Sequence, residues 1–127
     1  MNIKNIDSIS AYKLIETNLR AVIVDVRTAE EWQAGIPQLD NGKVFFISWR
    51  LFHDNVLNDQ FANQFMINIQ DKKIPVLFLC RSGIRSLEAA QFASSIGYTD
   101  CYNILDGFQG TIKGAGWQKN NLPWKSL

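Results

Sequence analysis

The sequence contains few of the residues that bind metals or form disulfide scaffolds. In 127 residues it has two cysteines, Cys80 and Cys101, and one histidine, His53. These residues do not stand at the paired spacing of a zinc site, so no metal is predicted. An isolated pair of cysteines is also poor evidence for a disulfide in a cytoplasmic protein. We expect Cys101 to be a small buried hydrophobic residue and His53 to be an exposed loop residue.

The sequence also lacks a charge excess and any long apolar run. Its 13 basic and 12 acidic side chains give a net charge of +1, so nothing indicates nucleic acid or an anionic membrane as a partner. No apolar run approaches the roughly 20 residues that cross a bilayer. Residues 1–7 lack the apolar region of a signal peptide, and we therefore expect a cytoplasmic protein. The length and the 46% hydrophobic content predict one domain with a buried core over residues 1–127.

Short apolar runs alternate with helical patterns along the chain. The apolar runs predict strands at residues 21–26, 43–47, 76–79 and 101–103. The helical spacing predicts helices at residues 7–18 and 58–70 and a short helix that begins at Thr28. A further helix is predicted after the loop that follows Cys80, and it ends at Gly97. Residues 35–42 are turn-rich, and residues 106–116, with four glycines, predict a loop. This alternation predicts an α/β domain with a mainly parallel sheet, helices on both faces and right-handed crossovers.

The most informative stretch runs from Val76 to Ser86. Residues 76–79 are continuously apolar, which is typical of a central parallel strand covered on both faces. The strand ends at Cys80, and a short polar loop then leads into a helical pattern. A cysteine in this position lies at the carboxyl end of the sheet and next to a helix N-terminus, where α/β proteins bind ligands.

The loop after Cys80 has features that stabilise a thiolate, which is the nucleophilic form of cysteine. The unpaired N–H groups and the dipole of a helix N-terminus favour negative charge. Gly83 allows the backbone to curl around the sulfur, and Arg81 and Arg85 add fixed positive charge that matches an oxyanion. The alternative is that Cys80 is an inert core residue, because free cysteine is often buried. Two arginines within five positions of Cys80, at a helix start, favour the nucleophile.

The loop Cys80-Arg81-Ser82-Gly83-Ile84-Arg85 resembles the active-site loop of the rhodanese family of sulfurtransferases, in which the cysteine carries a persulfide. Further stretches are similar to family motifs in the same order: Val22–Arg27 followed by Glu30–Trp32, Asn103–Phe108, Gly116–Trp117 and Leu122–Trp124. The resemblance spans about residues 5–124 and implies a rhodanese-like three-layer fold around a mainly parallel, five-stranded sheet. The segment Ala34–Asp40 lacks a histidine that many members carry, but that histidine is not the nucleophile.

The resemblance implies that Cys80 is catalytic and that Arg81, Ser82, Gly83, Ile84 and Arg85 form the substrate-binding loop. We expect Asp25, Arg27 and Ser86 to support this loop. For Asp25 we favour pairing with a nearby arginine or capping of a backbone N–H, and we also raise the hypothesis that it orients Arg85 or the loop.

The segment after the strand at residues 43–47 has two interpretations. By the switch-point rule, residues 48–53 line the mouth of the site, where Trp49 and Arg50 shape a pocket for donor or acceptor. In the alternative, which we favour slightly, Trp49 packs locally and Arg50 is solvated.

The length of the loop bears on the reaction. Four residues separate Cys80 from Arg85, whereas cysteine phosphatases have five, and the shorter loop fits a bound sulfur better than a whole phosphate. We therefore predict a sulfurtransferase that moves sulfane sulfur from an anionic donor such as thiosulfate, through a Cys80 persulfide, to a thiol or cyanide, without any cofactor. Two alternatives stay open. One is a non-catalytic carrier or sensor that passes sulfur to a protein partner, and the other is a cysteine phosphatase or arsenate reductase.

Overall fold

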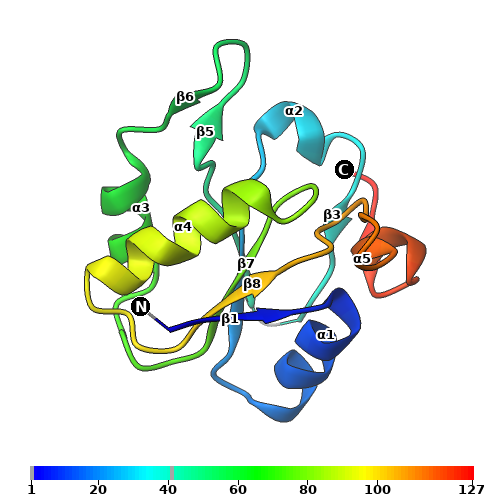
Figure 1. Cartoon of the computed structure of the whole chain (residues 1–127), viewed down its shortest axis with the longest axis horizontal. Helices are drawn as coiled ribbons and strands as arrows, with labels where there is room; N and C mark the ends of the chain where they lie inside the picture. The colour runs from blue at the N-terminus through cyan, green and yellow to red at the C-terminus, as the bar shows by residue number, and fades with distance from the viewer. Residues whose placement is uncertain (1, 41) are drawn as a thin grey trace.

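Five parallel strands form the central sheet in the order β1-β8-β7-β2-β4 (Figure 1). The structure, a computed structural model, describes residues 2–40 and 42–127. The strands are β1 (Ile3–Ile6), β2 (Val22–Asp25), β4 (Val44–Phe46), β7 (Val76–Leu79) and β8 (Cys101–Ile104). Strands β2 and β4 extend the sheet in one direction and β7 and β8 in the other. The switch point therefore lies between β7 and β2, and ligands of such sheets bind at the carboxyl ends beside it.

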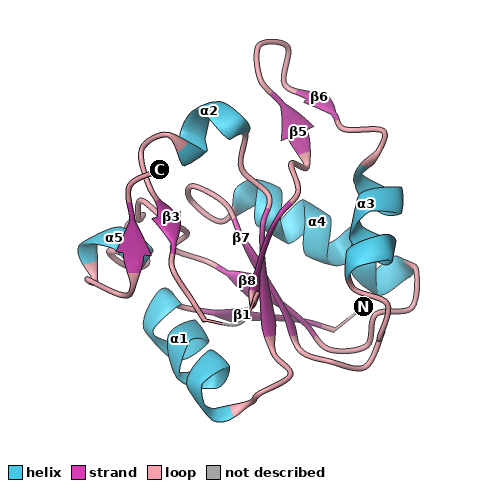
Figure 2. Cartoon of the chain, turned by 180° about the vertical axis from the view of Figure 1, so that it is seen from behind, coloured by secondary structure: helices cyan, strands magenta, loops and turns pink. Residues whose placement is uncertain are grey.

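Helices cover both faces of the sheet (Figure 2). They are α1 (Ser8–Thr17), α2 (Ala29–Trp32), α3 (Phe61–Asn68), α4 (Ile84–Ser95) and α5 (Gly116–Lys119). Val76 and Phe78 of β7 pack in one core cluster with residues of α3 and α4, whereas Leu77 and Leu79 pack in a second cluster with residues of α1 and α5. All four β7 residues are fully buried, as expected for a central strand, and the predicted three-layer α/β arrangement around a five-stranded parallel sheet is confirmed.

Two small antiparallel pairs lie outside the sheet. Strand β3 (Ile36–Pro37) pairs with β9 (Trp124–Lys125), and β5 (Arg50–Leu51) pairs with β6 (Val56–Leu57). The first pair fixes the end of the chain, where the buried Trp117 donates its indole N–H to the carbonyl of Pro123 at 2.7 Å. The second pair projects as a hairpin beside α2 (Figure 1).

The predicted elements are found with small differences in their bounds. Asp7 caps α1, since its carboxylate accepts the Ser10 N–H at 2.8 Å, and Gly97 follows α4 with a φ of +103°. The predicted helix at residues 58–70 is shorter, Phe61–Asn68, because Asn58 forms a turn by accepting the Gln60 N–H at 3.0 Å. Residue 41, in the turn-rich stretch 35–42, lies outside the described residues.

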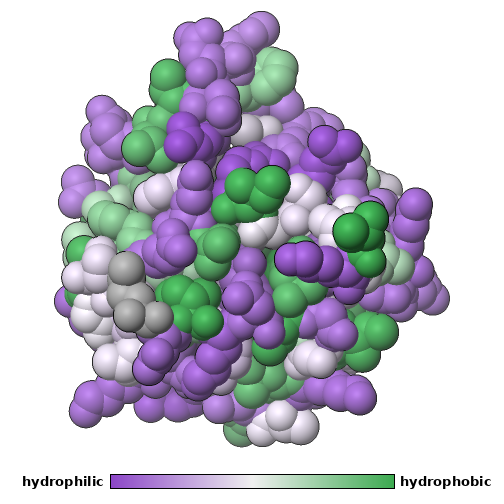
Figure 3. Space-filling model, viewed as in Figure 1, coloured by the Kyte–Doolittle hydropathy of each residue, from purple (hydrophilic) through white to green (hydrophobic). Residues whose placement is uncertain are grey.

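None of the helices within residues 2–40 and 42–127 has both the length and the apolarity needed to cross a bilayer. On the face shown in Figure 3, apolar side chains are scattered among polar ones rather than gathered into one continuous area.

Candidate active site

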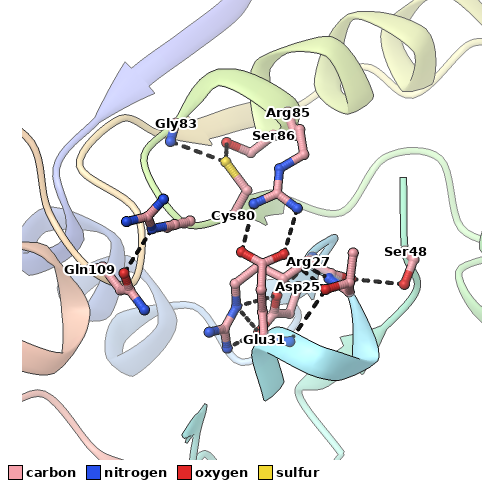
Figure 4. Close-up of polar contacts among 11 residues, drawn as sticks. Asp25, Arg27, Glu31, Ser48, Cys80, Gly83, Arg85, Ser86 and Gln109 are labelled. Carbon is pink, nitrogen blue, oxygen red and sulfur yellow. Dashed lines mark hydrogen bonds and ion pairs between the residues drawn. The ribbon is translucent and has the colours of Figure 1, made fainter. Parts of the chain in front are cut away.

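Cys80 follows β7 directly and is held under its loop. Its side chain is almost completely buried, with 1% of the residue exposed. The backbone N–H of Gly83 donates to Cys80 Sγ at 3.1 Å (Figure 4). Gly83 has a φ of +96°, and a Cβ there would lie 2.4 Å from the carbonyl oxygen of Leu105. Only glycine therefore fits where the loop turns toward the sulfur and into α4.

Ser86 and Asn103 form a hydrogen-bond chain behind the sulfur. Ser86 Oγ lies 3.1 Å from Cys80 Sγ and 2.6 Å from Asn103 Oδ1. The Asn103 amide in turn donates to the Gly83 carbonyl at 3.2 Å and to Asn5 Oδ1 at 3.0 Å. Sequence reasoning included Ser86 but missed Asn103 as a site residue. The signal in the sequence was a polar residue within the short strand pattern 101–103. The structure buries this asparagine in register with Phe78 of β7.

A second loop supports the cysteine loop from the other side. The N–H groups of Phe108 and Gln109 donate to the carbonyls of Cys80 and Arg81, at 2.8 and 3.1 Å. The two loops approach so closely that a Cβ on Gly107 would lie 2.3 Å from the Arg81 carbonyl oxygen. Arg81 itself is exposed and donates Nε–H to Gln109 Oε1 at 2.8 Å. Its charge thus has a neutral partner and stays available to an anion.

Arg85 is engaged by a carboxylate from another element. Its Nη1 and Nη2 donate to Glu31 Oε1 and Oε2 at 2.7 and 2.8 Å, which is a bidentate pair. Glu31 belongs to α2 and also completes a capping box, in which its Oε1 accepts from the N–H and hydroxyl of Thr28, both at 3.1 Å. Sequence reasoning placed Glu31 in the first turn of this helix but missed its contact with the loop.

The environment of Glu31 lowers its pKa. Burial alone would raise the pKa, but the hydrogen bonds from Arg85 and Thr28 and the charge of Arg85 outweigh it and lower the pKa of Glu31 to about 2. The hydrogen bonds and charge of Glu31, against the opposite effect of burial, raise the pKa of Arg85, and the charges of Cys80 and Asp25 raise it further. The pair is therefore ionised throughout the physiological range, and Arg85 lies within electrostatic reach of Cys80.

This pair predicts a pH-dependent contribution to folding. The pKa of Glu31 is about 2 in the folded protein against an ordinary value of 4.5, so its stabilisation is complete above pH 4.5 and is lost as the pH falls toward 2. We expect Glu31→Gln to lower the free energy of unfolding by about 1 kcal/mol at pH 7, since the partners are 21% and 24% exposed and partly screened. Urea unfolding from pH 7 to pH 2.5 should show this difference shrinking below pH 4.5. A difference that stays constant down to pH 2.5 would contradict the assignment.

Asp25 and Arg27 form a fully buried ion pair at the carboxyl end of β2. Both side chains are 0% exposed, and Arg27 Nη2 donates to Asp25 Oδ2 at 2.8 Å and to the Gly35 carbonyl at 3.0 Å. The guanidinium also lies over the Phe108 ring, 4.2 Å from its centroid. Asp25 thus pairs with a nearby arginine, as we favoured. The carboxylate of Asp25 is hydrogen-bonded to Arg27, and the hydrogen bonds of Arg85 go to Glu31, so Asp25 acts on Arg85 through its charge and not through a hydrogen bond. That Asp25 orients Arg85 or the loop stays a prediction.

Trp49 and Arg50 lie at the edge of the site. Trp49 packs edge-on against Phe61, with ring centroids 5.0 Å apart, and donates its indole N–H to Glu88 at 2.8 Å. Local packing is therefore the correct interpretation for Trp49. Arg50 is not simply solvated, because it pairs with Glu88 at 3.4 Å and faces a shallow hollow that Arg85 also lines.

A cleft of about 480 Å³ opens over the cysteine loop. It lies between α2, the turn of the β5–β6 hairpin and the loop, and its lining includes Glu31, Phe52, His53, Arg81, Arg85 and Gln109. His53 is an exposed loop residue, as predicted, and residues 51–53 line the mouth as the switch-point rule indicated. Ser82 is half-buried, and Ile84 is 71% exposed. Within residues 2–40 and 42–127, no three His, Cys, Asp or Glu side chains gather as a metal site.

The two cysteines lie at opposite ends of neighbouring strands. Cys80 follows the last residue of β7, whereas Cys101 is the first residue of β8 and pairs in register with Val76. Both are free thiols, and Cys101 is a buried member of the core. Burial and the charge of Asp100 raise the pKa of the Cys101 thiol to about 11, so it is a small hydrophobic residue as expected.

Comparison with known protein sequences identifies relatives along almost the whole chain. The model of the rhodanese-like domain family matches residues 9–113. The chain is 49% identical to the uncharacterized protein RC0915 of Rickettsia conorii, over 98% of this chain and 99% of that protein. It is 30% identical to the thiosulfate sulfurtransferase GlpE of Actinobacillus succinogenes, over 91% of this chain and 85% of that protein.

Solved structures show the same fold. Rv0390 from M. tuberculosis matches with a TM-score of 0.87 and 36% identity, over 100% of both chains. The polysulfide-sulfur transferase homodimer from Wolinella succinogenes matches with a TM-score of 0.76 and 21% identity, over 98% of this chain and 80% of that chain. At the lower identity the likeness is evidence for the fold alone.

Proposed function

The chain belongs to the rhodanese-like domain family, and on that premise we propose that it is a sulfurtransferase that works through a persulfide on Cys80. The observation that carries the proposal is the position of Cys80 Sγ, which accepts the Gly83 N–H at 3.1 Å at the start of α4. Arg81 and Arg85, on the same loop, add positive charge for an anionic donor. The thiolate and the persulfide anion both benefit from this arrangement.

The proposed reaction has two half-reactions. In the first, the Cys80 thiolate attacks the sulfane sulfur of thiosulfate, so that a sulfur–sulfur bond forms to Sγ while the bond to the sulfonate sulfur breaks and sulfite leaves with the electron pair. In the second, a thiolate or cyanide attacks the outer sulfur of the persulfide, and Cys80 leaves as a thiolate. The sulfur atom is passed on without any external oxidant or reductant, and no cofactor is required.

The intact mass of the protein after thiosulfate treatment tests this proposal. We expect a gain of the mass of one sulfur atom, which is lost when a reducing thiol is added. Steady-state turnover with cyanide should then show ping-pong kinetics. A persulfide that forms but turns over slowly with small acceptors would instead indicate a carrier that delivers sulfur to a protein. Absence of the adduct together with turnover of a phosphate ester or arsenate would overturn the proposal.

A further inference from the structure

The bidentate contact between Glu31 and Arg85 suggests that the site carries its own competing anion. We propose that Glu31 determines donor specificity, because its carboxylate occupies the guanidinium that a dianionic donor such as thiosulfate would use. The inference rests on the proposed sulfur transfer and narrows its donor class. The preferred donor is then a singly charged persulfide, whose outer sulfur passes to Cys80 while the donor leaves as a thiolate.

The Glu31 carboxylate is already fixed in its bound position before any donor arrives. Its Oε1 accepts two hydrogen bonds from Thr28 at 3.1 Å in addition to the bond from Arg85 at 2.7 Å. A carboxylate held in this way loses little conformational entropy when it binds the guanidinium. A thiosulfate ion must displace it or share Arg85 with it, and either costs binding free energy.

Charge counting at the mouth leads to the same conclusion. Arg81 and Arg85 bring two positive charges to the loop, and Glu31 cancels that of Arg85 at contact distance. Arg81 is bound to the neutral side chain of Gln109 and keeps its charge available. One arginine without an ion-pair partner suits a single negative charge better than the two of thiosulfate. The second negative charge of thiosulfate would stay unpaired in a half-buried site, where it loses part of its hydration without compensation.

The sequence of α2 provides a closely matched pair of variants. Glu31→Gln removes the charge but keeps an oxygen for Thr28, since glutamine also completes a capping box. Glu30→Gln makes the same change in net charge on the same helical turn. Glu30 is exposed and faces the same cleft, yet it forms no ion pair among the described residues. A difference between the two variants therefore reports the contact with Arg85 rather than the general field.

The test is steady-state kinetics with thiosulfate and with 2-hydroxyethyl persulfide as donors. Glu31→Gln should lower the KM for thiosulfate about three- to tenfold, which is the range of one or two partly screened charged hydrogen bonds. Its kcat, and its KM for the persulfide, should stay within about twofold of the wild type. Glu30→Gln should change the KM for thiosulfate by less than about twofold. Equal KM values in the two variants would overturn the inference while leaving the sulfur-transfer proposal intact.

A binding measurement separates this inference from the proposed function. Calorimetric titration of sulfate, a dianion of similar shape to thiosulfate, into Cys80→Ser and into Cys80→Ser/Glu31→Gln requires no chemistry. We expect the double variant to bind sulfate about three- to tenfold more tightly. If neither donor produces a persulfide but sulfate binding tightens, the proposed function fails and the role of Glu31 as internal anion stands. Unchanged sulfate affinity would overturn that role.

Discussion

Replacement of Cys80 by serine is expected to reduce the rate of sulfur transfer from thiosulfate to cyanide by at least about 1000-fold, as removal of a covalent nucleophile does in other enzymes. A serine hydroxyl is close in size to the thiol and can accept the Gly83 N–H that now points to Sγ. It cannot form a persulfide, however, so both half-reactions lose their shared intermediate. The initial rate of thiocyanate formation and the intact mass after thiosulfate treatment both measure this loss.

Cys101 provides the matched control for this experiment. It is the other free cysteine of the chain, and its thiol is buried with its pKa raised to about 11, so it is protonated near neutral pH. Cys101→Ala should therefore keep the transfer rate within about twofold of the wild type and should still gain one sulfur atom. If Cys80→Ser retained the sulfur adduct, or if Cys101→Ala lost it, the nucleophile would be wrongly assigned.

The sequence was sufficient to predict the part of the site that lies on one continuous segment. The apolar run of β7, the loop after Cys80 and the start of α4 are consecutive, so periodicity and composition locate them together. The Asp25–Arg27 pair could also be predicted from the sequence. Residues two apart in an extended chain point to the same side, so these two side chains can meet.

The contacts that the sequence did not reveal join distant segments. Glu31 and Arg85 are 54 residues apart, and Arg81 and Gln109 are 28 apart. Before the fold is known, Glu31 is simply an acidic residue in the first turn of a helix, where it is favourable for local reasons. Strand β1 was missed for a different reason. It is an edge strand with only one neighbour, β8, and Lys4 and Asn5 interrupt its apolar pattern.

The buried Asp25–Arg27 pair leads to the prediction with the largest effect on stability. Asp25→Asn should lower the free energy of unfolding by about 3 to 5 kcal/mol, because it leaves the guanidinium of Arg27 buried without a counter-charge. Both side chains are fully buried, so water cannot replace the lost carboxylate. Arg27 Nη1 already lacks a hydrogen-bond partner among the described residues. The guanidinium therefore has few other hydrogen bonds to offset the loss of the Asp25 carboxylate. Urea unfolding monitored by the fluorescence of the tryptophans measures the change.

A double variant distinguishes the loss of a charge partner from the loss of shape. Asp25→Asn combined with Arg27→Met removes both charges, and a buried ion pair replaced by neutral groups often costs little stability. The double variant should therefore be more stable than Asp25→Asn alone.

The Asp25–Arg27 pair also contributes to the position of the cysteine loop. Arg27 lies over Phe108, whose N–H donates to the Cys80 carbonyl, so the guanidinium supports the cysteine loop through one aromatic ring. If Asp25→Asn were as stable as the wild type, the ion pair would contribute little to the free energy of unfolding and the prediction would be wrong.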